Sequence, residues 1–177
     1  MGQELTKKVL NDRRLVFVGG FEHKSHPMIN KKIKNVTNIN SDLIVSNNPD
    51  PIIKNADVLI DFTTPSSTIS NVKIASKNKT AVVIGTTGMN LNQKNKIKSF
   101  TKKIPILMSS NMSLGVNLLF NLVQQASSVL TDIDYDIGIA ETHHKHKKDA
   151  PSGTALSLGE FAASGRKTNL NKTKVLD

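Results

Sequence analysis

The sequence contains no cysteine and no tryptophan, and one tyrosine, among its 177 residues. The absence of cysteine excludes disulfide bonds, thiolate catalysis and cysteine-ligated zinc. No run of about 18 consecutive apolar residues occurs, and the start lacks the charged, apolar and small-residue order of a signal peptide, so no membrane partner is expected. The chain is nevertheless long enough to bury a substantial core. We expect a soluble, cytoplasmic protein.

Acidic residues are also scarce: 14 Asp and Glu stand against 24 Lys and Arg, which gives a net charge of +10 at pH 7. Such a charge is compatible with nucleic acid, a membrane surface or an anionic small molecule. The lysines are spread along the chain and interleaved with asparagines, as at 31–35 and 92–96, which is typical of solvated surfaces. Nucleic-acid-binding modules usually interleave basic with aromatic residues. We therefore predict no nucleic-acid partner.

Four short runs are apolar at successive positions, which is typical of strands buried on both faces of a parallel sheet. They cover Leu15–Val18, Asp57–Phe62, Ala81–Ile84 and Ile104–Met108. Helices are expected at Gly2–Asn11, Pro65–Lys77 and Asn90–Lys102. These repeated β-α-β units predict an α/β fold with a doubly wound parallel sheet.

In such a fold, ligands bind at the carboxyl ends of the strands. Glu22 follows the first run, where a dinucleotide-binding fold places the carboxylate that binds the adenine ribose; a plain surface glutamate is the alternative interpretation. The later runs end in loops of small polar residues at 61–65, 85–88 and 109–112. Three such loops at successive strand ends predict a nucleotide-binding cleft.

A dinucleotide-binding fold also needs a first strand and a Gly-rich turn before its first helix, because the backbone N–H groups there hold the pyrophosphate. The sequence begins with Met1 and Gly2 directly before the first helical pattern. Glu22 lies about 20 residues downstream of where that turn would be. We therefore expect a Rossmann-like sheet lacking its first strand, with Met1 and Gly2 as what remains of the Gly-rich loop.

The segment from Glu141 to Ala155 has the highest density of ionisable and hydrogen-bonding side chains in the sequence. Three histidines and three lysines occupy positions 143–148, and a helix start follows at Asp149, Pro151 and Ser152. A helix N-terminus presents free backbone N–H groups to an anion, here at 153–154, so a carboxylate or phosphate is the predicted ligand. A solvated basic loop is the alternative. A metal site is not predicted, because no further ligand recurs at a suitable spacing.

These residues resemble a known family. Residues 141–155, ETHHKHKKDAPSGTA, look like the signature of the 4-hydroxy-tetrahydrodipicolinate (dihydrodipicolinate) reductases. The segments DFT at 61–63, GTTG at 85–88 and NMSLGVN at 111–117 resemble the family's other motifs, in the same order. The resemblance therefore covers nearly the whole chain.

The resemblance implies two domains: a nucleotide-binding domain at 1–113, incomplete at its N-terminus, and part of an α+β substrate and tetramerisation domain at 114–177, incomplete at its C-terminus. It implies reduction of a cyclic imine dicarboxylate with NADH or NADPH, in lysine and diaminopimelate synthesis. It also implies a homotetramer with a small-molecule substrate.

The resemblance also implies roles for individual residues, according to their positions in the motifs. The resemblance implies an acid/base role for His143, a substrate contact for His144 and proton donation by Lys147, while Gly153 and Thr154 would hold a substrate carboxylate. The implied cofactor contacts are Met1, Glu22, Gly85, Thr86, Thr87, Ser109, Ser110, Asn111 and Met112.

The departures from the family pattern lead to further expectations. A chain truncated at both ends is implied, so we expect weak or no nicotinamide binding and poor folding. An absent central strand would leave Val16, Val18, Leu59 and Phe62 uncovered. The alternative functions are a non-catalytic remnant or split-gene fragment of the reductase, and a basic nucleic-acid-binding module that uses residues 145–148.

Overall fold

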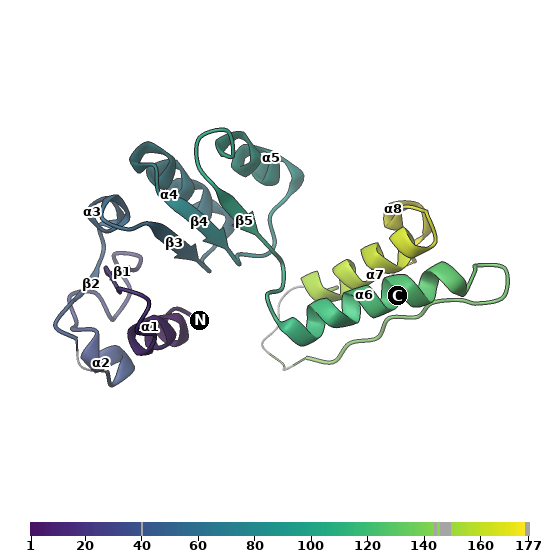
Figure 1. The fold of residues 1–177 in the computed structure, drawn as a ribbon, viewed down its shortest axis with the longest axis horizontal. Coiled ribbons are helices and arrows are strands. Elements are labelled where there is room, and N and C mark those ends of the chain that lie inside the picture. The colour runs from purple at the N-terminus through teal and green to yellow at the C-terminus, as the bar shows by residue number, and fades with distance from the viewer. Residues whose placement is uncertain (40, 144, 146–149, 176–177) are drawn as a thin grey trace. The chain divides into compact units, whose positions relative to one another are not determined.

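The computed structural model describes residues 1–39, 41–143, 145 and 150–175 (Figure 1). The chain divides into two compact units, Met1–Met108 and Ser109–Asp177. Within the described residues, no helix is both long enough and apolar enough to cross a membrane.

The first unit alternates helices with short parallel strands. In chain order its elements are α1 (Gly2–Asn11), β1 (Gly20–Phe21), α2 (Lys34–Thr37), β2 (Val45–Ser46), α3 (Pro49–Lys54), β3 (Val58–Asp61), α4 (Pro65–Asn78), β4 (Ala81–Ile84), α5 (Leu91–Phe100) and β5 (Ile106–Met108). The predicted α/β class is confirmed, and α1, α4 and α5 lie where helices were expected.

The strands form two separate sheets, in the orders β1-β2 and β3-β4-β5, and every pairing is parallel (Figure 1). The predicted strand at Leu15–Val18 is wrong, because pairing begins at Gly20, opposite Val45. The residues before Val45 do not continue this pairing with the chain before Gly20, because Ile44 forms an antiparallel bridge with Lys32 instead. Among the residues that the structure describes, Leu15–Val18 therefore have no neighbouring strand with which to form a ladder.

Side-chain caps fix where the helices of the first unit begin. The hydroxyl of Thr64 accepts a hydrogen bond from the backbone N–H of Ser67, and Pro65 follows it as the first residue of α4. Asn90 and Gln93 cap α5 reciprocally in a capping box.

The core of the first unit lies between α4 and the three-stranded sheet. Val72 of α4 is fully buried, as is Ile84 of β4. Leu59 of β3 belongs to the same cluster and is 8% exposed, so the expectation that it would be uncovered is wrong: α4 covers it. Val16 is indeed uncovered, at 86% exposed.

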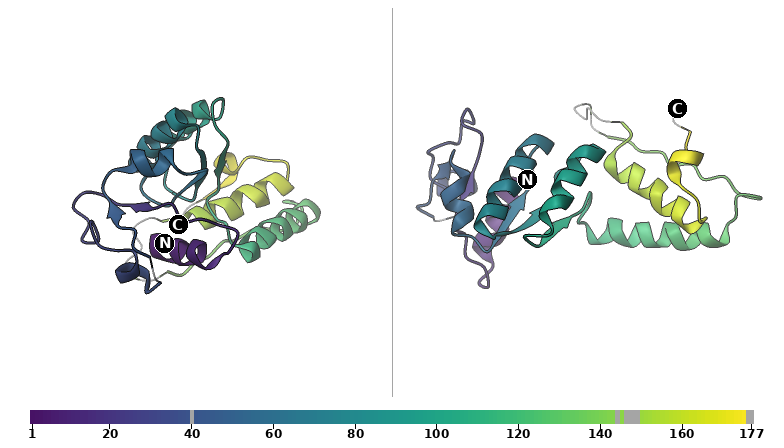
Figure 2. Two further views of the ribbon diagram at one scale, coloured as in Figure 1. Left: turned by 60° about the vertical axis from the view of Figure 1, so that its left-hand side comes forward. Right: turned by 90° about the horizontal axis from the view of Figure 1, so that it is seen from above.

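The second unit contains α6 (Leu114–Val129), α7 (Gly153–Gly165) and α8 (Leu170–Thr173). Helices α6 and α7 lie side by side in both views of Figure 2. The rings of Phe120 and Phe161 stack between them with centroids 5.0 Å apart. Helix α7 begins after Ser152, as the sequence predicts.

Candidate functional site

A buried carboxylate joins the loops that follow β3 and β4. Asp61, the last residue of β3, is 1% exposed. Its Oδ1 accepts hydrogen bonds from the hydroxyl and backbone N–H of Thr63, at 2.7 and 3.1 Å, and its Oδ2 accepts one from Nδ2 of Asn71 at 2.8 Å. The hydroxyls of Thr68 and Thr86 lie 2.9 and 3.1 Å from Oδ1. These five residues, the Asp61 cluster, compensate the burial of the carboxylate.

The Asp61 cluster also engages one predicted cofactor contact, Thr86. Its hydroxyl accepts a hydrogen bond from the backbone N–H of Thr63 at 2.9 Å and lies 2.8 Å from the hydroxyl of Thr68. A hydroxyl donates one hydrogen bond and accepts two. The side chain of Thr86, 7% exposed, therefore fixes the loop, whereas the next residue, Thr87, is exposed.

Gly85 has a packing role beside its predicted cofactor role. A Cβ on Gly85 would lie 2.1 Å from Cε1 and 2.2 Å from Cζ of Phe62. The ring of Phe62, the residue after β3, thus occupies the space that a side chain at position 85, directly after β4, would need.

Gly85→Ala is expected to destabilise the first unit by about 1 to 3 kcal/mol, because the added methyl overlaps the Phe62 ring. In the Gly85→Ala/Phe62→Ala double variant this overlap is absent, so its loss of stability should be smaller than the sum of the two single losses. Urea unfolding of the wild type, both single variants and the double variant measures this coupling. Additive losses would contradict the packing role.

Glu22, the predicted ribose ligand, follows β1. Its backbone N–H donates to the carbonyl oxygen of Ser46 in β2 at 2.9 Å, and its side chain is exposed. Glu22 lines a cavity of about 440 Å³ together with Thr63 from the end of β3. Four residues of α1 also line this cavity, namely Gly2, Leu5, Thr6 and Val9. Met1, 70% exposed, is the N-cap of the helix.

In the second unit, the predicted cofactor loop contacts a predicted substrate residue. Nδ2 of Asn111 donates to the hydroxyl of Thr154 at 3.3 Å, and the hydroxyls of Ser110 and Ser157 lie 3.1 Å apart. The hydroxyl of Ser109 donates to the carbonyl oxygen of Asn111 at 2.7 Å, which shapes the loop. The first turns of α7 therefore hold the loop, whose last predicted contact, Met112, is 43% exposed.

The start of α7 suits an anion. The hydroxyl of Ser152 caps the helix by accepting a hydrogen bond from the backbone N–H of Ala155 at 3.0 Å. Gly153 and Thr154 lie in the first turn, where backbone N–H groups have no acceptor within their own helix. Together with the positive end of the helix dipole, these two groups can bind a carboxylate.

Glu141 fixes this helix start. Its carboxylate accepts hydrogen bonds from the backbone N–H of Ser152 at 2.7 Å and from the hydroxyl of the same residue. Nδ1 of His143 lies 3.8 Å from Oε2 of Glu141. One carboxylate thus holds the start of α7 and lies near the predicted acid/base histidine, whose side chain is 40% exposed.

Two predicted site residues, His144 and Lys147, lie outside the described residues. The same is true of His146, Lys148 and Asp149. The roles of His144 and Lys147 stay predictions.

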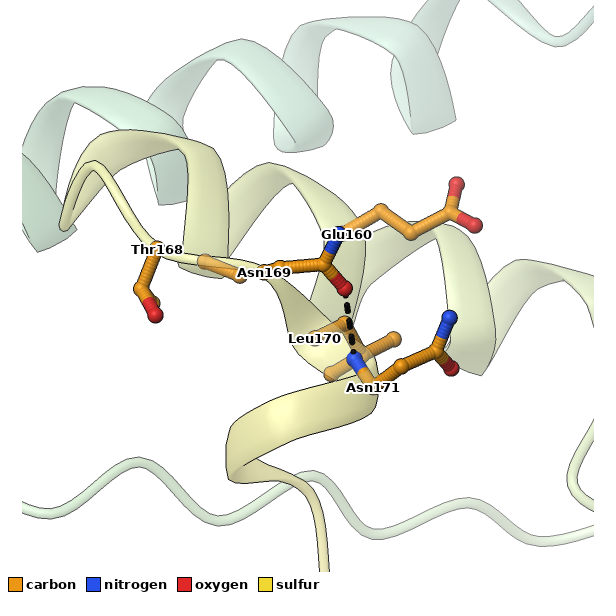
Figure 3. Close-up of a pocket in the computed structure, with 6 residues that line it drawn as sticks. Glu160, Thr168, Asn169, Leu170 and Asn171 are labelled. Carbon is orange, nitrogen blue, oxygen red and sulfur yellow. Dashed lines mark hydrogen bonds between the residues drawn. The ribbon is translucent and has the colours of Figure 1, made fainter.

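A smaller pocket, of about 300 Å³, lies between α7 and α8 (Figure 3). Its wall includes Glu160 and the turn at 168–171, where Oδ1 of Asn169 accepts a hydrogen bond from the backbone N–H of Asn171 at 2.9 Å. Leu170 packs there so closely that a Cβ on Gly159 would lie 2.9 Å from its Cδ1. With one carboxylate and several amides, the described wall of this pocket favours no reaction, and we assign it no function.

The sequence patterns gave no role to two residues that organise the site, although both lie in the motifs quoted above. Asp61 carried a local signal, as an acidic residue that ends an apolar strand, but its partners lie up to 25 positions away. Glu141 lies 11 positions before Ser152, a separation that no helical or strand period indicates.

Family models match both units of the chain. One, described as dihydrodipicolinate reductase, N-terminus, matches residues 1–112, and another, dihydrodipicolinate reductase, C-terminus, matches residues 115–176. The chain belongs to the dihydrodipicolinate reductase family. The resemblance drawn from the sequence motifs is thereby confirmed.

Individual members of the dihydrodipicolinate reductase family agree with this assignment. The chain is 45% identical over 170 residues to the 4-hydroxy-tetrahydrodipicolinate reductase of Pelagibacter ubique (strain HTCC1062), a match that covers 96% of this chain and 62% of the relative. It is 48% identical over 134 residues to that of Sulfurovum sp. (strain NBC37-1), covering 76% and 52%. The chain thus spans less than two thirds of the length of these relatives.

A solved structure of a dihydrodipicolinate reductase is similar along the chain. It is the dipicolinate-bound enzyme from Paenisporosarcina sp. TG-14, with a TM-score of 0.69 and 26% sequence identity, and the match covers 99% of this chain and 68% of that one. This likeness confirms a Rossmann-like first unit.

Proposed function

We propose that this chain serves in the reduction of 4-hydroxy-tetrahydrodipicolinate to tetrahydrodipicolinate, with NADH or NADPH as the cofactor, in lysine and diaminopimelate synthesis. The contact between Asn111 and Thr154 supports this best, because it joins a loop suited to the cofactor to a turn suited to a carboxylate. The proposal places the protein in the cytoplasm, and assembly as a homotetramer belongs to it as a further prediction.

The substrate is a dicarboxylate, and the start of α7 supplies donors for one of its carboxylates. The backbone N–H groups of Gly153 and Thr154 would bind and orient it, with Glu141 holding the turn in place. Reduction of the conjugated imine leaves an electron-rich enamine that must be protonated. We assign this proton to Lys147, with His144 as a substrate contact and His143, which lies 3.8 Å from Glu141, as the acid/base group.

The donor set of the described residues fits a dinucleotide. Glu22 supplies a carboxylate beside the end of β1 for the ribose hydroxyls, and Gly85 and Thr87 leave a loop with little side-chain bulk at the end of β4. Ser109 to Met112 would complete the cofactor contacts, together with Met1 and Thr86. The bound cofactor would supply the hydride.

Dipicolinate, the planar dicarboxylate bound by the related enzyme, tests the substrate site directly. Thr154→Val is expected to weaken its binding by about tenfold, since the variant loses a hydroxyl and its contact with Asn111. Calorimetric titration of the purified chain measures the change.

Thr168→Val is the matched control, because Thr168 lies beyond the end of α7, beside α8. It should bind dipicolinate as the wild type does. Equal affinities of the wild type, Thr154→Val and Thr168→Val would contradict the placement of the site at the start of α7.

A separate assay tests the reaction. The chain is mixed with 4-hydroxy-tetrahydrodipicolinate and with NADH or NADPH, and the absorbance of the reduced nicotinamide is followed. Consumption that requires the protein and the substrate together supports reductase activity. Dipicolinate binding without consumption of either cofactor would instead identify a non-catalytic relative that keeps the substrate site.

A further inference from the structure

Thr68, in the first turn of α4, is a buried threonine that lies outside the motifs quoted from the sequence. Its side chain is 0% exposed, so a ligand bound at the surface does not contact it. Its hydroxyl nevertheless reaches the ends of two strands. It lies 2.9 Å from Oδ1 of Asp61, the last residue of β3, and 2.8 Å from the hydroxyl of Thr86, in the loop after β4.

This hydroxyl supports a bond that joins the two loops directly. The backbone N–H of Thr63, after β3, donates to the hydroxyl of Thr86 at 2.9 Å. A hydroxyl rotates about its C–O bond, and its other partners decide where its lone pairs point. Thr68 supplies one of these partners from α4, a helix whose place on β3 and β4 is fixed by the buried side chains of Val72 and Ala75.

The loop after β4 shows which groups this support leaves available. Thr86 is 7% exposed and Met89 is 9% exposed, so buried side chains anchor the loop on both sides. Between them, Thr87 is exposed, and Gly88 has a φ of 76°, in the left-handed region that glycine adopts readily. The anchors therefore present Thr87 and Gly88 as a short turn beyond the carboxyl end of β4, where a doubly wound fold binds its ligand.

We propose that Thr68 is a positioning residue of the cofactor site. Its hydroxyl, acting through Asp61 and Thr86, holds the loops at 61–65 and 85–88 in the arrangement that receives the nicotinamide cofactor. Binding then does not have to order these loops, so the affinity depends on a hydroxyl that the cofactor does not contact. This inference deepens the proposed function and rests on it for the identity of the ligand, NADH or NADPH.

Two substitutions separate the hydroxyl of Thr68 from its methyl group. Thr68→Val replaces the hydroxyl with a methyl group, which neither donates nor accepts, whereas Thr68→Ser keeps the hydroxyl. We expect Thr68→Val to weaken binding of NADH and NADPH to the full 177-residue chain by about tenfold. Thr68→Ser should bind them as the wild type does. Titration followed by the fluorescence of the reduced nicotinamide measures these affinities.

Thr80→Val is the matched control, because it removes an equally buried hydroxyl at a different place. Thr80 directly precedes β4 and is 2% exposed, and its hydroxyl donates to the carbonyl oxygen of Ile53 at 2.8 Å. Urea unfolding should show similar losses of stability in Thr80→Val and Thr68→Val, since each loses a buried hydrogen bond. The cofactor affinity of Thr80→Val should nevertheless equal that of the wild type.

Hydrogen exchange of the Thr63 amide tests the link between the loops without any cofactor. This N–H donates to the hydroxyl of Thr86 and to Oδ1 of Asp61. In Thr68→Val it should exchange at least about tenfold faster than in the wild type, because local opening becomes easier. In Thr68→Ser and Thr80→Val it should exchange at the wild-type rate. Nuclear magnetic resonance of the chain alone measures these rates.

The outcomes separate this inference from the proposed function. If the wild type binds neither NADH nor NADPH, the cofactor assignment fails and the positioning role fails with it. If the wild type binds a cofactor and Thr68→Val binds it equally well, only the positioning role is overturned. Two further results would overturn that role: equal weakening by Thr80→Val, which would indicate general destabilisation, and equal Thr63 exchange rates in Thr68→Val and Thr68→Ser.

Discussion

Replacing Asp61 with alanine is expected to lower the free energy of unfolding of the first unit by more than about 3 kcal/mol. The substitution removes the acceptor of the Asn71 amide and of the hydroxyls of Thr63, Thr68 and Thr86, in a site where Asp61 is 1% exposed. Each buried donor left unsatisfied costs about 1 to 3 kcal/mol. Urea unfolding followed by circular dichroism measures the loss.

Two variants make this result specific. Asp57→Ala removes an exposed carboxylate just before the start of β3 and should change stability by less than about 0.5 kcal/mol. Asp61→Asn should lie between the two, because it keeps an acceptor for Asn71 but turns an NH₂ group toward the backbone N–H of Thr63. Equal, small losses in all three variants would show that the Asp61 cluster contributes little to stability.

The elements that could be predicted from the sequence are those whose signals are local. The apolar run at Ala81–Ile84 coincides with β4, and the predicted helices begin at Pro65 and directly after Ser152. The loops at 61–65 and 85–88 were expected to lie close together because parallel strands end at the same edge, and the bond between Thr63 and Thr86 confirms this contact.

What could not be predicted depends on partners that are distant in sequence. Leu15–Val18 have the composition of a strand, but a strand also needs a neighbouring strand. Ile44, directly before β2, bridges to Lys32 and so does not extend the pairing toward Leu15–Val18. Thr86 was expected to contact the cofactor, and that stays a prediction; its hydroxyl also bonds the carboxylate 25 positions earlier, a partner that no local pattern indicates. The composition of a loop shows that ligand contacts are possible; the contacts within the protein decide which side chains remain available.

Helix α7 offers a final test of packing, because the same substitution at its two ends is expected to have opposite effects. A Cβ on Gly165 would lie 2.3 Å from the carbonyl oxygen of Gln124 and 2.9 Å from Cβ of Ser127, both in α6. A backbone oxygen cannot move unless the helices separate. Gly165→Ala is therefore expected to destabilise the second unit by about 3 kcal/mol.

At the other end of α7, a Cβ on Gly153 would meet no atom within 4 Å. Gly153→Ala should stabilise the helix by about 0.5 to 1 kcal/mol, because alanine loses less backbone entropy on folding than glycine. It also keeps the N–H group that would bind the substrate carboxylate, so dipicolinate affinity should not change. Thermal melting of both variants, with dipicolinate titration of Gly153→Ala, separates helix propensity from packing: stabilisation by both substitutions would mean that α6 and α7 do not approach closely at Gly165.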